Sequence, residues 1–497
     1  MSLSGTLTAG QNVGRLAAIL NSAEAREYYS YNWGPKIAYI ANDDVRYIYC
    51  NDRDCNSMEI KYLLKVNEAT NIALSMRHPG ASNLYGIRIM VGQEGGKAFY
   101  IDCSVWYACD SAYNTIKEMP NTWYPDIYPA NKWGSDGPIY FSFGQRQTVD
   151  GNKFTTIGTC TYSWPYDNCS NPTLSPIDNG TANNNPPADV GNDTQISMDN
   201  SGAFGVQPIP VMTYVKREGN TASLFMTRQV GAGGNCPLNS SWSCSEIAIG
   251  SIGRFPSLAI TTDGYSRIAY VDKNPKTLKY IYCQPGDKTC PQPTITTVNC
   301  SINGDSCEVL DYASLKLNTN NQPRIAFNVK YTDSASGQIR YALRFAWCDT
   351  LPCTDSASWH VQSIMSDVGA PGVQVYNEGL AMTARNTYTL DFDWPMMVFY
   401  KADTQDLMFV SCNDIHCDSS VAPPTIKVLD YGANLLLPDS QLTVNGAVIA
   451  FGKTQLNRTL LDQSGSKPGE IFNFLPRYFY IFHGIVKEQV RYQEITP

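Results

Sequence analysis

Short apolar runs recur along the chain, separated by polar turns. In residues 267–290, RIAYVDKNPKTLKYIYCQPGDKTC, an apolar run, a polar turn and a second apolar run lead to a pair of cysteines. Runs rich in Ile, Val, Tyr, Phe and Thr with short polar connections are typical of β-hairpins. The stretch therefore predicts a hairpin whose second strand ends at a cysteine.

This hairpin is one copy of a repeated unit. Its first run occurs in eight copies, which begin at Lys36, Ile87, Pro138, Ile209, Arg267, Arg324, Pro395 and Ala447. In seven of the eight units the second run leads to a cysteine pair, and the eighth, EIFNFLPRYFYIF, has none. A further run precedes the first, as in 256–264 and 313–321, and a fourth follows the cysteines. Each unit is therefore predicted to be a four-stranded antiparallel meander.

A single meander cannot bury both of its faces, and closing several meanders into a ring removes the exposed edges. We therefore predict an all-β fold, a β-propeller of four-stranded antiparallel blades whose hairpins are stapled by local disulfides. The eight copies favour eight blades. Seven blades are the alternative, because the innermost strand of the first unit would have to come from the polar AREYYSYN.

The repeats also suggest how the chain divides. Residues 1–30 are expected to form an N-terminal segment with helical periodicity, in VGRLAAILNSAEAREYY, and a strand that leads into the ring. Residues 31–497 are expected to form a single propeller domain. Within it, residues 175–195 are rich in Asn, Pro and Gly and predict an irregular insertion.

The cysteines all fall into close pairs. Zinc sites bring two Cys-x2-4-Cys knuckles together, whereas the loops here hold four to eight residues and the chain has only four His. Local disulfides formed in an oxidising environment explain the pattern better. The predicted pairs are Cys50 with Cys55, Cys103 with Cys109, Cys160 with Cys169, Cys236 with Cys244, Cys283 with Cys290, Cys300 with Cys307, Cys348 with Cys353, and Cys412 with Cys417.

The repeats PKIAY at 35–39 and LKYIYC at 278–283 resemble those of secreted microbial β-propellers. The resemblance spans nearly the whole chain. It implies the fold and not a function, because propellers support many functions.

The composition limits the kinds of binding partner that we expect. The net charge of -8, the pI near 5.2 and the absence of a run of basic residues argue against binding of nucleic acid. Only 16% of residues are charged, so the surface is predicted to be neutral and polar. No apolar run is long enough to span a membrane. The sequence contains no motif for a cofactor or a metal ion. His416, within CNDIHC, is interpreted as a loop residue between paired cysteines. The N-terminus does not read as a signal peptide, yet the disulfides predict an extracellular, cell-surface or virion-surface location.

No catalytic residue is predicted. The S-x-D-x-G-x-x-W box of sialidases and the G-x-S-x-G elbow are not legible, which leaves enzymatic activity uncertain and favours a binding or structural module for protein or glycan. The alternative is a secreted carbohydrate-active hydrolase with a carboxylate pair in the propeller channel. Self-assembly into a fibre or coat is a third interpretation.

The loops between the first and second runs are the predicted binding surface, because such loops gather on one face of a propeller. The candidate binding residues in these loops are Lys216, Arg217, Asp272, Lys273, Lys330, Asp333, Lys401 and Asp403. Aromatic residues in or beside the cysteine loops are expected to be exposed, namely Trp106, Trp164, Trp242 and Trp359.

Overall fold

The fold is seen in a computed structural model of the chain. The structure describes residues 15–22, 34–41, 43–76, 87–103, 109, 114–120, 122–129, 139–146, 153–160, 162–163, 166–167, 172–180, 189–202, 207–218, 221–254, 256–367, 373–374, 379–382, 393–401, 406–430 and 450–452.

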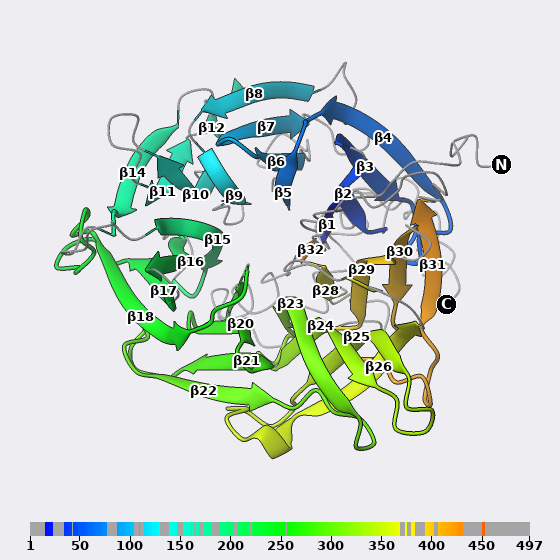
Figure 1. Cartoon of the computed structure of the whole chain (residues 1–497). Helices are drawn as coiled ribbons and strands as arrows, with labels where there is room; N and C mark the ends of the chain where they lie inside the picture. Colours follow the sequence, from blue (N-terminus) through cyan, green and yellow to red (C-terminus); the bar gives the residue numbers. More distant parts are fainter. Residues whose placement is uncertain are drawn as a thin grey trace, which may run out of the picture.

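Seven antiparallel sheets surround a central axis (Figure 1). In each blade the strands run from the innermost, first strand to the outermost, fourth strand. Blade 1 holds β1 (Arg15–Ser22), β2 (Lys36–Ala41), β3 (Asp44–Cys50) and β4 (Met58–Lys65). Blade 2 holds β5 (Ala69–Met76), β6 (Ile87–Gln93), β7 (Lys97–Cys103) and β8 (Asn114–Pro120). Blade 3 holds β9 (Thr122–Pro129), β10 (Ile139–Arg146), β11 (Lys153–Cys160) and β14 (Thr173–Asp178), with β12 (Tyr162–Ser163) and β13 (Tyr166–Asp167) as a small separate sheet.

The other blades follow the same order around the ring. Blade 4 holds β15 (Asp189–Asp199), β16 (Ile209–Glu218), β17 (Thr221–Gln229) and β18 (Trp242–Gly250). Blade 5 holds β19 (Ser257–Ile260), β20 (Ser266–Lys273), β21 (Lys276–Cys283) and β22 (Pro293–Val298). Blade 6 holds β23 (Ser306–Leu317), β24 (Pro323–Thr332), β25 (Ile339–Trp347) and β26 (His360–Asp367), with the short helix η1 (Ser356–Ser358) before β26. Blade 7 holds β27 (Val373–Gln374) and β28 (Leu380–Met382) against β29 (Pro395–Lys401), then β30 (Asp406–Ser411) and β31 (Thr425–Asp430).

The predicted propeller is confirmed, but with seven blades rather than the favoured eight. Seven of the eight sequence copies form second strands. The copy that begins at Ala447 contributes only β32 (Ala450–Gly452), which pairs in parallel with β1. Because residues 450–452 pair with a strand of blade 1, they do not begin an eighth blade. The rest of the eighth unit lies outside the described residues.

Two local expectations also change. Residues 15–22, expected to be helical, form β1 and pair with β2, so part of the N-terminal segment belongs to blade 1. Short apolar runs do not distinguish a strand from a helix by periodicity alone, and here the pairing with β2 decides. Of the predicted insertion 175–195, residues 175–178 and 189–195 lie in β14 and β15.

The core lies between the blades because strand side chains alternate between the two faces of a sheet. Ile268 and Tyr270 of β20 pack in a cluster with blade 4, whereas Ala269 and Val271 pack in a cluster with blade 6. Every second strand therefore contributes to two cores. This explains why these runs are continuously apolar and not alternating.

Polar side chains on the innermost strands join successive blades. Asp126 Oδ2 accepts a hydrogen bond from Ile196 N at 2.7 Å, and Gln195 accepts one from Leu258 N. Ser257 Oγ in turn accepts from Leu315 N at 2.9 Å, and Ser314 Oγ accepts from Leu380 N at 3.0 Å. Blades 3 to 7 are thus linked around the channel by one repeated contact, which satisfies backbone donors that a sheet edge leaves unpaired.

Buried polar contacts also join blade 7 to blade 1. Tyr39 donates its hydroxyl to Asp430 Oδ2 at 2.7 Å, and Arg46 Nη1 lies 3.1 Å from the same oxygen. The Asp430 carboxylate is almost fully buried, with 2% of its side chain exposed. The ring therefore closes through a buried ion pair between blades 7 and 1.

Seven of the eight predicted disulfides are present. Six of them close the loop between the third and fourth strands of a blade: Cys50 with Cys55, Cys103 with Cys109, Cys236 with Cys244, Cys283 with Cys290, Cys348 with Cys353, and Cys412 with Cys417. The seventh joins Cys300 with Cys307 and closes the connection from blade 5 to blade 6. The predicted pair of Cys160 with Cys169 is not covered, because Cys169 lies outside the described residues.

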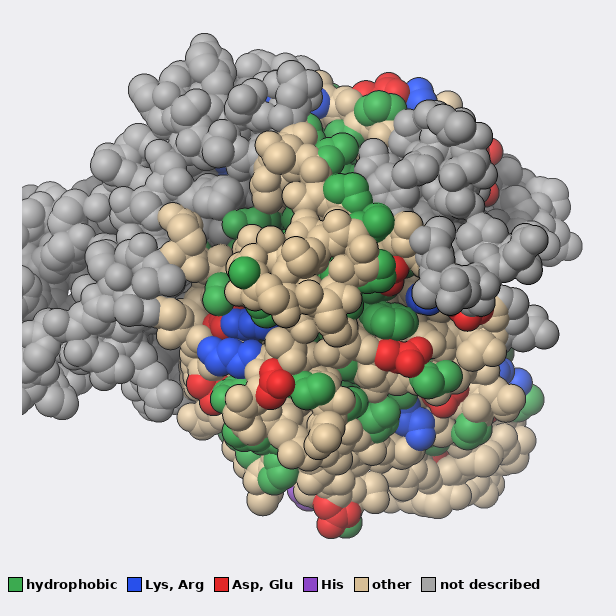
Figure 2. Space-filling view, turned by 90° about the vertical axis from the view of Figure 1, so that its left-hand side faces the viewer, with side chains coloured by type: hydrophobic (Ala, Val, Ile, Leu, Met, Phe, Trp, Pro, Cys, Tyr) green, Lys and Arg blue, Asp and Glu red, His purple; other side chains and the backbone are tan. Residues whose placement is uncertain are grey.

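The surface agrees with the composition. Figure 2 views the molecule from the left-hand side of Figure 1 and shows few charged side chains among the described surface residues. Most of the described part of this face consists of neutral side chains and backbone, with hydrophobic side chains among them. The described part therefore carries few charges, as the low fraction of charged residues predicts.

Candidate functional site

The ring has two faces that differ in their loops. Because strands alternate in direction, the turns between second and third strands lie on the same face as the connections between blades. We call this the hairpin face. The turns between first and second strands and the cystine loops between third and fourth strands lie on the opposite face, which we call the disulfide face.

On the hairpin face, the predicted binding residues of blade 4 are engaged in ion pairs. Arg217 Nη2 lies 3.2 Å from Asp193 Oδ2, and Arg254 Nε lies 3.3 Å from Asp193 Oδ1. Lys216 Nζ lies 3.0 Å from Glu218 Oε1. Arg217 also reaches the carbonyl of Ile252, so it helps to hold the connection between blades 4 and 5.

The predicted residues of blade 5 adjoin the same connection. The backbone of Asp272 forms an isolated antiparallel β-bridge with Ile252, and Lys273 N donates to Ser251 O at 2.8 Å. The structure therefore brings Arg217, Asp272 and Lys273 to one junction through the backbone of 251–252, whereas Lys216 pairs with Glu218 inside its own hairpin.

The remaining candidates are spread further around the ring. Lys330 lies opposite Glu308, which also binds Lys276 at 2.9 Å. Asp333 pairs with Arg340 at 3.1 Å inside its own hairpin. Lys401 ends β29, and Asp403 lies outside the described residues.

On the disulfide face, a basic residue near the start of the second strand binds the cystine loop in three blades. Lys36 Nζ donates to the carbonyls of Gly34 and Cys50, at 2.9 and 3.1 Å. Arg267 Nη1 donates to Ser266 and Cys283 at 2.8 and 2.9 Å, and Arg324 Nη1 donates to Pro323 and Cys348 at 3.1 and 3.3 Å. This contact explains the basic residue in the PKIAY and SRIAY repeats.

The buried Lys36 is expected to make the stability of the fold depend on pH. Burial lowers the pKa of Lys36 to about 7, so above that pH the folded chain holds one proton fewer than the unfolded chain. We expect the free energy of unfolding to rise with pH, by up to about 2 kcal/mol between about pH 7.5 and 9. In Lys36→Arg, which copies blades 5 and 6, this rise should disappear. Urea unfolding of both proteins across this range measures it, and equal slopes would contradict the account.

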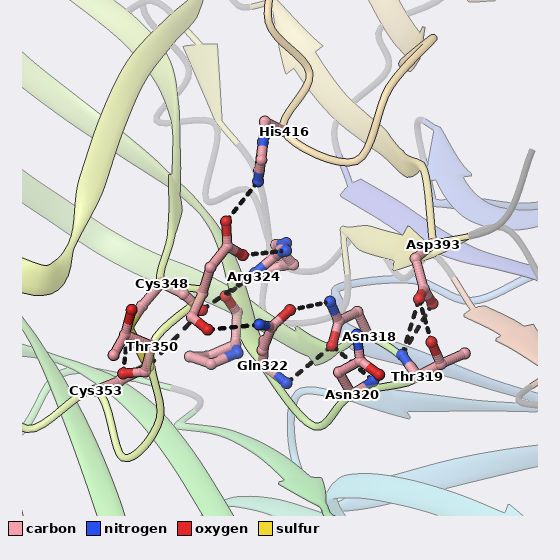
Figure 3. A network of polar contacts seen from close by, with 12 residues as sticks. Asn318, Thr319, Asn320, Gln322, Arg324, Cys348, Thr350, Cys353, Asp393 and His416 are labelled. Atoms are coloured by element: carbon pink, nitrogen blue, oxygen red, sulfur yellow. Dashed lines mark hydrogen bonds and ion pairs between the residues drawn. A yellow bond between two sulfur atoms is a disulfide. The ribbon is translucent and has the colours of Figure 1, made fainter.

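A network of turn side chains crosses blades 6 and 7 (Figure 3). Asn318 Oδ1 accepts from the backbone N of Asn320 and Gln322, at 3.0 and 2.9 Å, and Gln322 Nε2 donates to Asp349 O at 2.6 Å. Asp349 Oδ1 pairs with Arg324 Nη2 at 2.7 Å, and its Oδ2 lies 2.7 Å from His416 Nε2 in the cystine loop of blade 7. His416, expected to be a solvated loop residue, thus joins two blades.

The network continues to both sides. Asn321 accepts from Thr262 N at 2.8 Å and donates to its hydroxyl at 2.9 Å, which links blade 6 to blade 5. Thr319 N donates to both oxygens of buried Asp393 at 3.0 Å, which adds a second link to blade 7 (Figure 3). We call this joined set, together with the neighbouring Asp263, the turn cluster: Thr262, Asp263, Asn318, Thr319, Asn320, Asn321, Gln322, Asp349, Asp393 and His416.

Charge and aromatic contacts fix the outer end of the turn cluster. Partial burial opposes ionisation of Asp349, but Arg324 and His416 outweigh it and lower the pKa of this carboxyl. The His416 ring stacks on Trp347 at 5.1 Å between centroids. Asp349 is therefore ionised at neutral pH, and His416 is held between a carboxylate and an aromatic face.

The turn cluster also has exposed polar side chains. Asp263, Thr319 and Asn320 are exposed, and Asp263 has no hydrogen bond or ion pair within the described part of the chain. Such a surface can donate and accept hydrogen bonds to a polar ligand. The signal in the sequence is the Asn-rich stretch LNTNNQ, a composition that predicts a turn but no ligand.

The prediction of exposed tryptophans is wrong for two of the four. Trp242 and Trp359 are buried in the cores, with 3% and 8% exposure, while Trp106 and Trp164 lie outside the described residues. Trp359 donates its Nε1 proton to Cys353 O at 3.1 Å, so it packs beneath the cystine loop instead of standing out from it.

Three buried carboxylates on the innermost strands have structural partners. Asp126 binds backbone N–H groups, Asp193 pairs with two arginines, and Asp199 pairs with Arg228 and with Lys288. No group of three His, Cys, Asp or Glu side chains in the described part of the chain could hold a metal ion. A search of the same residues finds no helix that is long and apolar enough to cross a membrane.

Comparisons with known proteins give structural matches only. No protein-family model matches the chain, and no curated protein matches its sequence. Among solved structures, the GH93 alpha-L-arabinofuranosidase of Fusarium graminearum matches with 9% identity and a TM-score of 0.38, over 63% of this chain and 83% of that chain. The fucose-specific lectin from Aleuria aurantia matches with 14% identity and a TM-score of 0.38, over 75% and 99% of the two chains. The Synechocystis apocarotenoid oxygenase (Trp149Ala mutant) matches with 10% identity and a TM-score of 0.38, over 85% and 90%. The propeller assignment rests on the seven sheets themselves.

Proposed function

We propose that the protein is an extracellular binding module that holds a glycan on the turn cluster of the disulfide face. The observation that carries this proposal is the set of hydrogen bonds that fixes the turns of blades 5, 6 and 7 to one another. A surface held in place before binding loses little conformational entropy when the ligand arrives.

The disulfides support the extracellular location. Local cystine loops form and persist in oxidising surroundings, and each described third-to-fourth-strand disulfide lies on the proposed binding face. The cystine loops of blades 6 and 7 take part in the turn cluster through Asp349 and His416. The same disulfides would therefore stabilise the fold and the binding surface.

The chemistry of the exposed groups favours a glycan. The hydroxyl, amide and carboxylate groups of Thr319, Asn320 and Asp263 match the donors and acceptors of sugar hydroxyls. The buried centre of a protein–protein interface is depleted of charged residues and enriched in aromatic ones, whereas the exposed residues here are small and polar. The hairpin face, with Lys216, Arg217, Asp272, Lys273, Lys330, Asp333, Lys401 and Asp403, is the alternative binding face of this proposal.

A glycan array with paired variants tests the proposal. We expect the wild-type protein to bind a subset of glycans, and Asp263→Ala with Asn320→Ala to lower affinity for them at least tenfold, because both exposed side chains are lost. Lys273→Ala with Lys330→Ala on the hairpin face is the matched control and should retain binding. Loss in the hairpin-face variant alone would move the site to that face, and no binding to any glycan would contradict the proposal.

The hydrolase alternative has weaker support. Retaining and inverting glycosidases both need two carboxyl groups that flank one bond, about 5–10 Å apart. The three buried innermost-strand carboxylates described above are engaged in folding contacts. Self-assembly through the C-terminal segment remains a prediction, because residues 453–497 lie outside the described part.

A further inference from the structure

A buried arginine recurs at one position of the second strand, opposite the residue that precedes a half-cystine. Arg88 in blade 2 and Arg324 in blade 6 both occupy it. Each has an acid beside it: Arg88 Nε lies 3.7 Å from Asp102 Oδ1, and Arg324 Nη2 lies 2.7 Å from Asp349 Oδ1. At this position the guanidinium is thus accompanied by a carboxylate in both blades.

Arg267 occupies the same position in blade 5 without an acid. Its Nη1 is used by two carbonyls, and its Nε is buried without a hydrogen-bond partner, as are those of Arg88 and Arg324. The difference lies at Nη2, which no hydrogen bond or ion pair within the described residues reaches, whereas Nη2 of Arg324 binds an acid. Gln284 follows Cys283 where Asp349 follows Cys348, and its amide binds Thr294 instead. The Arg267 residue is only 4% exposed.

The open edge of Arg267 is suited to a carboxylate. Nε and Nη2 form the side of a guanidinium that binds a carboxylate through two parallel hydrogen bonds. The guanidinium carbon lies 3.9 Å from the centroid of the Tyr282 ring, which fixes the plane of the group. A buried charge is costly unless it is paired, so an anion at this edge would compensate the charge of the guanidinium.

Neighbouring groups provide the walls of this position. Tyr280 lies on the same face of blade 5 as Arg267, and its hydroxyl is buried without a partner. Burial raises the pKa of Tyr280, so the hydroxyl keeps its proton and can donate. The Tyr280 ring meets Trp359 of blade 6 edge-on at 5.1 Å, which places the position at the junction of blades 5 and 6.

We propose that Arg267 binds the carboxylate of an acidic sugar, a uronate, at the junction of blades 5 and 6 on the disulfide face. The choice of a sugar rests on the proposed function, and the choice of a carboxylate rests on the acids beside Arg88 and Arg324. Exposed Asp263 belongs to the turn that leads into β20, so the sugar ring would lie toward the turn cluster.

Substitution of Gln284 tests this inference without removing the arginine. Gln284→Asp supplies an acid at the position of Asp349, so it should occupy the Arg267 edge, raise the melting temperature and abolish binding of sodium glucuronate. Gln284→Asn is the matched neutral control and should bind as the wild type does. Arg267→Met should lose binding at least tenfold; if it fails to fold, the Gln284 pair decides.

Titration calorimetry and thermal shifts provide the readout. Glucuronate should raise the melting temperature of the wild type, because a ligand of the native state stabilises it, while glucose at equal concentration should not. Equal glucuronate binding by wild type and Gln284→Asp would overturn the inference, as would binding of an acidic peptide without glucuronate. If the array shows binding to neutral glycans but glucuronate does not bind, only the Arg267 assignment is overturned. If glucuronate binds but Asp263→Ala with Asn320→Ala leaves glycan binding unchanged, only the proposed function is overturned.

Discussion

Asp430→Ala should lower the free energy of unfolding by about 3 kcal/mol, because removal of one partner leaves a buried charge and a buried hydroxyl uncompensated. Of the ion pairs among the described residues, Arg46 would retain the one with Asp44, at 3.2 Å, and the Tyr39 hydroxyl would lose its acceptor. The contact joins blades 7 and 1, so the loss falls on the closure of the ring. Urea unfolding at neutral pH measures it.

Two further variants show whether burial is the cause. Tyr39→Phe removes only the hydroxyl and should cost about 1 kcal/mol. Glu118→Gln removes an ion pair with Lys97 at 2.8 Å whose side chains are 51% and 47% exposed, and should change stability by less than about 1 kcal/mol. If Asp430→Ala were as mild as Glu118→Gln, the ring would not depend on this closure.

Gly264→Ala should be destabilising for two reasons, by about 4 kcal/mol in total. Gly264 has a φ of 91°, which side chains rarely adopt, and a Cβ there would meet the Asp199 carboxylate and the Lys288 ammonium. The substitution would therefore strain the turn and displace the partly buried ion pair of Asp199 with Lys288, which joins blades 4 and 5. The turn of TTDGYSRIAY therefore requires glycine for both reasons.

Gly337→Ala is the matched control, because Gly337 also has a positive φ, 68°, but nothing lies near its added Cβ. It should cost only about 1 kcal/mol of conformational strain.

The dependence of stability on pH provides a second check. Burial opposes ionisation of Asp199, but bonds from Ser201 and Arg228 lower its pKa to about 2, so its stabilising effect is present above the ordinary pKa of 3.8 and is lost as pH falls toward 2. Gly264→Ala should lack this acid-dependent loss, and an unchanged acid profile would contradict the contact.

The strands that carry cysteines could be predicted from sequence because local pattern determines them. Arg267–Lys273 and Lys276–Cys283 lie where the repeat places them. The blade count could not be predicted, because it depends on long-range pairing: RLAAILNS becomes β1 only through β2, and the eighth run pairs with β1 instead of starting a blade.

The candidate site was less predictable than the fold. Charge on hairpins is visible in sequence, but whether Arg217 is available depends on Asp193, which lies in another strand of the blade. The turn cluster depends on contacts across blades, such as His416 with Asp349, that are 67 residues apart in the chain. An unpaired Arg267 can be recognised only by comparison with its structural equivalents.

Hydrogen exchange of the protein with a bound glycan tests the central claim most directly, because it reports which face the ligand covers. The account predicts slower exchange at residues 261–265, 318–322 and 349–353, with no change at 216–218, 272–276 and 330–340. Protection confined to the hairpins, with the turns of blades 5 and 6 unchanged, would contradict binding at the turn cluster.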